Sequence, residues 1–393
     1  MKFVKSDNLA TGMRLAKQIY NKNGVLLYDR GTKLTASGIS NIKNFQLIGI
    51  YILEPTESLK PLTEEELQFE QRQTVYMFHL RTCFTKLYSQ EKPETLQNMI
   101  TDILKRYGSL GKQIYFSQNL RSVDDSIYKH AINSAIFCAM IAGQIGMKEE
   151  NKYALVCAAL LYDIGYLQAP NSIWYKNTEL SDSDKRVLQQ NLEKGLPILK
   201  EQQDSFPFFP LAFQAIKHYI NYIRYPQEDL SPFPSDFVTL ANILAVAVAF
   251  DEATAMSNDR EPLSSLAAME ILQANPKIYK PAIVHALAQS IHITPAGASV
   301  DLSNGDRGII VSENTSNYLQ PRILNLRDYQ VYDLSDRRVL QDVQLHDISP
   351  SMDMRIPTDE NTIKQFHADE RTKQTTAEFL EKRKHIMERG EHL

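Results

Sequence analysis

Apolar residues in the middle of the chain recur every three or four positions, as they do on helices that bury one face. The pattern extends from residue 62 to residue 292, with start and stop signals such as Asp125 and Gly146. We therefore predict helices over 64–90, 94–107, 127–145, 149–163, 181–199, 211–222, 237–256, 263–275 and 281–291. Together they form one helical domain.

Both flanks of this helical region carry strand patterns and tight-turn signals. Asn23-Gly24 and Asn304-Gly305 each stand between apolar runs, which is typical of a hairpin turn because both residues tolerate positive φ. We expect hairpins over 18–28 and 300–311, a helix over 35–44, and strands over 48–53, 322–326 and 330–334. The predicted fold class is mainly α, with a helical bundle between two small β-rich units.

The domain organisation follows from these patterns. We assign a small β-rich N-terminal domain to 1–56, the helical domain to 62–292, a small β-rich C-terminal unit to 293–348 and a charged tail to 349–393. Pro55 and Pro61 mark the linker before the helices. The tail could form one helix over 373–389, but it lacks a continuous apolar face, so we expect it to be mobile or docked on a partner.

Composition and charge narrow the class of protein. The 43 basic and 47 acidic residues give a net charge of −4, which offers no electrostatic case for binding a nucleic acid polymer. Cys83, Cys138 and Cys157 form no CxxC pair, and we expect buried reduced thiols. The N-terminus lacks a signal peptide's apolar core, and runs such as 243–250 are far shorter than the roughly 20 residues of a membrane span. We predict a cytoplasmic protein.

The most informative feature is an ordered set of short motifs between residues 130 and 253. His130 begins a helix and is followed by Leu160-Leu161-Tyr162-Asp163-Ile164-Gly165-Tyr166, then Asn191-Leu192-Glu193-Lys194-Gly195, His218-Tyr219, Arg224-Tyr225-Pro226 and Ala247-Val248-Ala249-Phe250-Asp251-Glu252-Ala253. This order and spacing resembles the HD-GYP branch of the HD metal-dependent phosphohydrolases. The resemblance covers about residues 120–275, and the first hairpin looks like the β domain that often precedes it.

The resemblance implies both a fold and an activity. Active HD-GYP proteins hydrolyse the bacterial second messenger cyclic di-GMP, with two or three iron or manganese ions in a helical bundle. At the positions that would hold these metals, the family's residue is kept at His130, Asp163 and His218. It is replaced at Ser126, Tyr162, Asn191, Tyr219 and Val248. Tyr166 stands in place of a phosphate-contacting Lys, and of the GYP motif only Tyr225 and Pro226 remain.

These replacements remove the chemistry that the family's reaction needs. Iron and manganese prefer imidazole and carboxylate ligands, whereas valine offers no donor and a phenol with a reference pKa of about 10 is a poor ligand. Without metals there is no activated hydroxide and no Lewis acid on the phosphoryl oxygens. We therefore expect no catalytic residue and no cofactor. Tyr162 and Tyr219 are expected to fill the space of the absent metals with their rings.

One interpretation of Asp251 would keep a reduced metal site. Asp251 lies three residues after Val248, so it shares nearly the same helix face and could join His130, Asp163 and His218 around one ion. The competing reading is that Asp251 pairs within the bundle and that both histidines are hydrogen-bonded core residues.

Our hypothesis is a degenerate HD-GYP-like protein that acts as a signalling or scaffolding module. It would bind a protein partner, with cyclic di-GMP binding and oligomer formation left open. The alternative is a residual cyclic di-GMP phosphodiesterase with iron or manganese in the reduced site.

Overall fold

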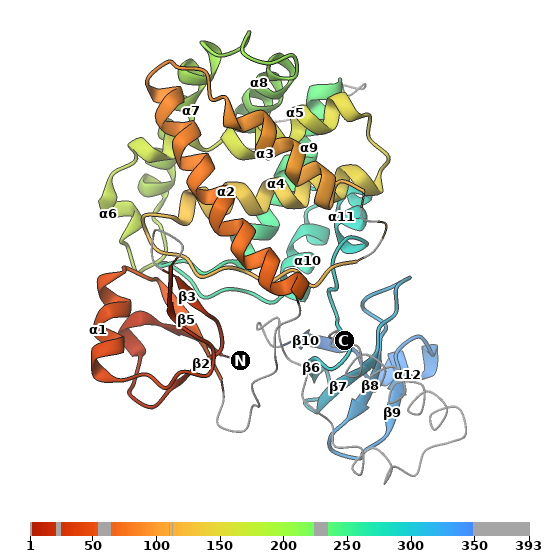
Figure 1. The fold of residues 1–393 in the computed structure, drawn as a ribbon. Coiled ribbons are helices and arrows are strands. Elements are labelled where there is room, and N and C mark those ends of the chain that lie inside the picture. Colours follow the sequence, from red (N-terminus) through yellow and green to blue (C-terminus); the bar gives the residue numbers. More distant parts are fainter. Residues whose placement is uncertain are drawn as a thin grey trace.

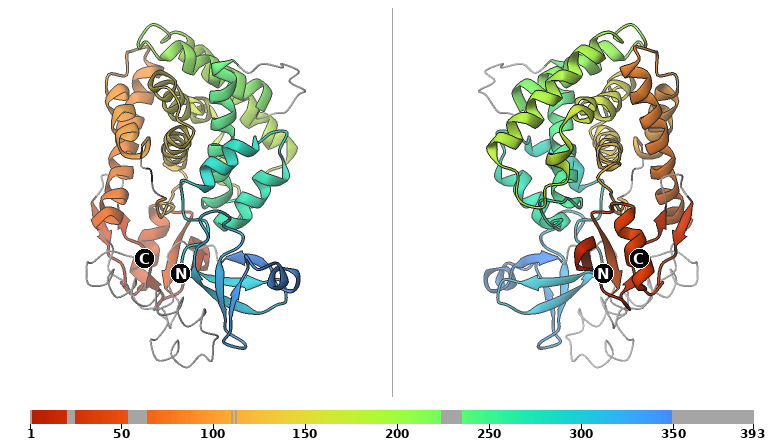
Figure 2. Two further views of the ribbon diagram at one scale, coloured as in Figure 1. Left: turned by 90° about the vertical axis from the view of Figure 1, so that its right-hand side faces the viewer. Right: turned by 90° about the vertical axis from the view of Figure 1, so that its left-hand side faces the viewer.

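The computed structural model describes residues 2–20, 25–53, 64–109, 111, 113–223 and 235–348. Some sequence predictions fall outside these residues: the turn at Asn23-Gly24, the linker prolines Pro55 and Pro61, the Tyr225-Pro226 pair, and the tail 349–393. The described chain is a helical bundle with one small β unit from each end of the sequence, and Figures 1 and 2 show both units at one end of the bundle. The predicted fold class is confirmed.

The N-terminal β unit, residues 2–53, is built around a three-stranded antiparallel sheet. Its strand order is β1-β5-β2, with β1 at Lys2–Lys5, β5 at Gly49–Leu53 and β2 at Arg14–Leu15. A separate two-stranded ribbon pairs β3 (Ile19–Tyr20) with β4 (Leu26–Tyr28). Helix α1 (Ala36–Asn44) begins after Thr35, whose side chain accepts the N–H of Gly38 as an N-cap. A 3-10 turn at Ser6–Asn8 follows β1.

The helical bundle is arranged around α4, which contacts α2, α3, α5, α9 and α11. Its α-helices are α2 (Glu64–Tyr88), α3 (Thr95–Tyr107), α4 (Ser126–Gln144), α5 (Glu149–Leu161), α6 (Asn171–Trp174), α7 (Asp182–Lys200), α8 (Phe209–His218), α9 (Asp236–Thr254), α10 (Ser265–Ala274) and α11 (Pro281–Ala288). A 3-10 turn at Ile164–Gln168 follows α5, and a π turn at Tyr219–Ile223 follows α8.

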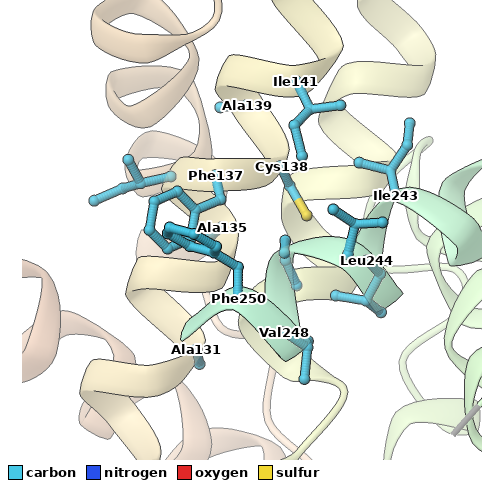
Figure 3. Close-up of a cluster of buried hydrophobic side chains, with 14 of the residues drawn as sticks. Ala131, Ala135, Phe137, Cys138, Ala139, Ile141, Ile243, Leu244, Val248 and Phe250 are labelled. Carbon is cyan, nitrogen blue, oxygen red and sulfur yellow. The ribbon is translucent and has the colours of Figure 1, made fainter. Parts of the chain in front are cut away.

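Helices α4 and α9 form the apolar centre of the bundle. Figure 3 shows Ala131, Ala135 and Phe137 of α4 facing Val248 and Phe250 of α9. Helix α9 is long and apolar enough to qualify by composition as a membrane span, but most of that stretch is buried inside the protein. A helix that is apolar on all sides is expected at the centre of a bundle, where every face meets another element.

The C-terminal unit is a five-stranded antiparallel sheet with the order β10-β6-β7-β8-β9. The strands are β6 (Ser299–Leu302), β7 (Arg307–Ser312), β8 (Arg322–Asn325), β9 (Val331–Asp333) and β10 (Leu345–Ile348). The predicted Asn304-Gly305 turn joins β6 to β7, with Gly305 at a φ of +84°. Strand β10 and helix α12 (Arg337–Asp342) were not predicted from the sequence.

The sheet and the helices share one hydrophobic core. Val300, Leu302, Ile310 and Ile323 of the sheet belong to the same cluster of buried side chains as the helices. At the boundary, Ser264 Oγ donates to Asp347 Oδ1 over 2.5 Å. The places where one domain ends and the next begins stay predictions.

Candidate functional site

His130 lies in the first turns of α4 and uses both ring nitrogens. Its Nδ1 is 2.5 Å from Asp251 Oδ2, and its Nε2 is 2.5 Å from the Tyr162 hydroxyl. The side chain of His130 is 12% exposed. Asp251 comes from α9 and Tyr162 from the end of α5, so three helices meet at this imidazole.

Asp251 is the centre of a buried polar cluster. Its carboxylate is 0% exposed and receives the Arg121 guanidinium, with Nη2 at 2.6 Å from Oδ2 and 2.8 Å from Oδ1. The amides of Asn133 and Gln118 donate to Oδ1 over 2.8 and 3.0 Å. We call Asp251, Arg121, His130, Asn133 and Gln118 the Asp251 cluster.

The electrostatics of the cluster keep Asp251 ionised. Burial by itself raises the pKa of this carboxyl, but the Arg121 guanidinium and His130 outweigh burial and hold the pKa well below its ordinary range. An ionised carboxylate only accepts hydrogen bonds, so Nδ1 of His130 donates to Asp251. Nε2 then either accepts the Tyr162 hydroxyl or carries a proton of its own. In neither form does His130 have a lone pair left for a metal.

Tyr162 and Tyr219 pack against each other next to His130. Their side chains are 1% and 2% exposed, and their rings meet edge to face with centroids 5.3 Å apart. Each stands where the family resemblance places a ligand histidine. The rings are large apolar bodies at positions where the resemblance places metal ligands. That they fill the space of the metals stays a prediction.

Val248 lies inside the apolar contact between α4 and α9. It is 1% exposed, and Figure 3 shows it beside apolar side chains of both helices. This position, which the resemblance assigns to a metal-binding Asp, is therefore part of the hydrophobic core. A carboxylate placed there would be buried, which is costly unless a cation pairs with it.

The other substituted positions have ordinary structural contacts. The hydroxyl of Ser126 donates to the carbonyl of Val123, at the start of α4. The amide of buried Asn191 donates to the Val187 carbonyl within α7. The ring of Tyr166, the position of the phosphate-contacting Lys, packs edge to face on Trp174 with centroids 5.6 Å apart.

The reduced metal set of His130, Asp163, His218 and Asp251 is not assembled. Asp163 is fully buried at the start of the 3-10 turn, and the His218 ring packs against Phe237 with centroids 5.7 Å apart. Among the described residues, no three His, Cys, Asp or Glu side chains lie together in a way that could hold a metal ion. The donors present therefore do not fit the iron or manganese centre that the resemblance implies.

Sequence reasoning missed most of the Asp251 cluster. Arg121 and Gln118 precede α4 in a loop whose sequence carries no recognisable motif. Asn133 had a usable signal, because it follows His130 by three residues and so lies on the same helix face. The second reading of Asp251, pairing within the bundle, is the one that the structure has.

Comparisons with known proteins place the helical region in a family. Residues 94–283 match the HD domain family. The cyclic di-GMP phosphodiesterase PA4108 of Pseudomonas aeruginosa is 24% identical over 214 residues, which are 52% of this chain and 49% of that protein. The cyclic di-GMP phosphodiesterase response regulator RpfG of Xanthomonas campestris pv. campestris is 28% identical over 154 residues, 38% of this chain and 39% of its own length.

This chain thus spans about half of one curated relative and about two fifths of the other. Among solved structures, Bd1817, an HDG"Y"P protein from Bdellovibrio bacteriovorus, is similar with a TM-score of 0.42 and 14% identity. That similarity covers 73% of this chain and 97% of the other, and it is too distant to carry an inference. Residues 94–283, which contain the ordered motifs from His130 to Asp251, thus match the HD domain family.

Proposed function

We propose that this chain is a degenerate HD-GYP-like protein of the cytoplasm that does not hydrolyse cyclic di-GMP. It acts as a signalling or scaffolding module by binding a protein partner. The observation that carries the proposal is the double engagement of His130 by Asp251 and Tyr162. A metal-dependent hydrolase needs this type of residue as a ligand, and here both of its nitrogens are used inside the protein.

The neighbouring positions support the same proposal. The carboxylate of Asp251 is already compensated by Arg121, and Val248 offers no donor. A two-metal phosphodiesterase activates its water and stabilises its leaving oxygen through the metals, so loss of the ligands removes both effects together. The near-neutral chain, with a net charge of −4, suits contact with a protein at least as well as attraction of an anionic dinucleotide.

The direct test measures metal content and turnover on the same preparation. The full chain, expressed with added iron and manganese, is analysed for bound metal and incubated with cyclic di-GMP, while PA4108 is treated in parallel as the active control. We expect less than about 0.1 metal ion per chain and no linear or mononucleotide product. Stoichiometric metal with turnover that disappears in Asp163→Ala would establish the alternative, a residual phosphodiesterase.

Cyclic di-GMP binding without hydrolysis is a separate proposal, supported by the names of the two curated relatives. Calorimetry with the dinucleotide tests it. Binding at micromolar concentration in the absence of turnover would make the module a nucleotide receptor, and no heat at high micromolar concentration rules that role out.

A further inference from the structure

We propose that the Arg121 guanidinium is the cation that compensates the buried Asp251 carboxylate in this HD domain. We further propose that the N-terminal β unit holds this guanidinium in place. The inference deepens the proposed function, on which it partly rests, because it names what compensates the charge of the site. It also assigns the N-terminal β unit a role in keeping the site closed.

The first support is the burial of a matched charge pair. Asp251 is 0% exposed and the Arg121 side chain 6%, with the guanidinium 2.6 Å from the carboxylate. Guanidinium is not deprotonated in proteins, so it is a permanent cation there. A buried carboxylate that loses its partner is strongly destabilising, which makes a cation at this place a requirement of the fold. In this chain an arginine meets that requirement.

The second support is the backbone on the other side of Arg121. Its carbonyl accepts the N–H of Ile48, the residue just before the central strand β5 of the N-terminal sheet, over 3.0 Å. Three residues before Arg121, the carbonyl of Gln118 accepts a hydrogen bond over 2.5 Å from Nζ of Lys17, which belongs to the same β unit. The amide side chain of Gln118 in turn donates to Asp251. Gln118 and Arg121 therefore contact the N-terminal β unit with their backbone carbonyls and Asp251 with their side chains.

These two sets of contacts imply a mechanical link. The guanidinium reaches Asp251 only while residues 117–123 keep their place, and Ile48 and Lys17 fix that place. Any change that loosens the N-terminal β unit should weaken the Arg121–Asp251 pair, and loss of the pair should loosen the β unit. The site and the β unit are then one cooperative structure.

The first experiment removes the cation from the full chain. Arg121→Ala should lower the thermal midpoint by about 10 °C, and methylguanidinium at millimolar concentration should restore part of the loss while methylammonium does not. Arg121→Met combined with Asp251→Leu should unfold at a higher temperature than either single variant. The matched control is Arg81→Met, whose guanidinium lies over the Tyr128 ring outside the cluster, and its midpoint should change little.

The second experiment tests the link and does not depend on Arg121 variants folding. In Lys17→Met, hydrogen exchange at the α9 amides around Asp251 should speed up at least about tenfold, as should exchange in β5. The control is Lys43→Met in the same β unit, where Lys43 pairs at the surface with Asp7. Unchanged α9 exchange in Lys17→Met would overturn the link.

Failure of this inference is distinguishable from failure of the proposed function. If Arg121→Ala unfolds at the wild-type temperature, Arg121 is not the required cation, whatever the activity. If the wild-type chain turns over cyclic di-GMP while Arg121→Ala is destabilised and rescued by methylguanidinium, the proposed inactivity is wrong and the inference stands.

Discussion

At the scale of single residues, the buried Asp251 carboxylate organises the contacts of the candidate site. Asp251 has charge compensation from Arg121 and hydrogen bonds from His130, Asn133 and Gln118. Arg121 balances the charge of this carboxylate, and the other three side chains share its hydrogen bonds.

The pKa of Asp251 predicts how its contribution to stability depends on pH. A carboxyl whose folded-state pKa lies below its unfolded value of about 3.9 stabilises the fold fully above about pH 5 and progressively less as the pH falls. Asp251→Asn should therefore cost about 3–5 kcal/mol at pH 7 and clearly less at pH 3. Urea unfolding of both proteins at the two pH values measures the difference. A cost that stays constant between them would contradict the ion-pair account.

The hydroxyl of Tyr162 gives a second residue-scale prediction. Tyr162→Phe keeps the buried ring but removes the partner of His130 Nε2, which should cost about 1 kcal/mol in the free energy of unfolding. It should also shift the side-chain nitrogen resonance of His130. Tyr175→Phe is the control, because its hydroxyl bonds Gln46 at the exposed surface and its loss should cost under about 0.5 kcal/mol. An unmoved His130 resonance would count against the contact.

At the scale of elements, a glycine contact fixes how the turn after α5 packs on α7. A Cβ at Gly165 would lie 1.9 Å from the carbonyl oxygen of Asn191 and 2.8 Å from the backbone nitrogen of Gly195. Because backbone atoms cannot move aside as a flexible side chain can, only glycine fits. The close approach places Tyr162, Asp163 and the rest of the turn against α7.

Gly165→Ala should therefore destabilise the protein by about 3 kcal/mol or more. Gly38→Ala in α1 is a control of opposite sign, because the nearest atom to its Cβ would be 3.4 Å away and alanine is the better helix former. That substitution should stabilise by about 0.5–1 kcal/mol. Chemical unfolding of the two variants beside the wild type measures both effects, and equal stabilities would refute the packing argument.

Element types could be predicted from the sequence, but several element ends could not. The helix predicted over 149–163 ends at Leu161, and the one predicted over 211–222 ends at His218 in a π turn. In both places the apolar pattern continues past the helix because the following turn is buried too. Strand β10 was missed because four residues have too little pattern, and its pairing with β6 is a long-range contact.

At the scale of the whole molecule, the C-terminal sheet completes the core of the helical bundle. Its buried residues, among them Val300 and Ile348, belong to the same hydrophobic cluster as the helices. At the boundary, His292 bonds Glu313 over 2.6 Å and stacks on Tyr115 with ring centroids 4.0 Å apart. We therefore expect the sheet to contribute to the stability of the helical bundle and not to fold as an independent unit.

A chain that ends at residue 292 should unfold at a lower temperature than the full protein and bind a hydrophobic dye, because apolar surface of the bundle becomes exposed. The control ends at residue 348 and removes only the charged segment, whose sequence lacks a continuous apolar face. Its melting temperature should stay close to that of the full chain. Equal melting temperatures for all three chains would show that the sheet adds nothing to the core.

The sequence by itself determined most element types and the mainly helical fold, and it carries the ordered motifs that resemble the HD-GYP family. These depend on local periodicity and on the order of short motifs, and both can be read from the sequence alone. Only the tertiary structure decided what Asp251 does, because Arg121 and Gln118 reach it from a segment about 130 residues away. Charge compensation of a buried group depends on which side chains lie next to it in the folded protein. The spacing of residues within one segment does not predict contacts with a distant segment.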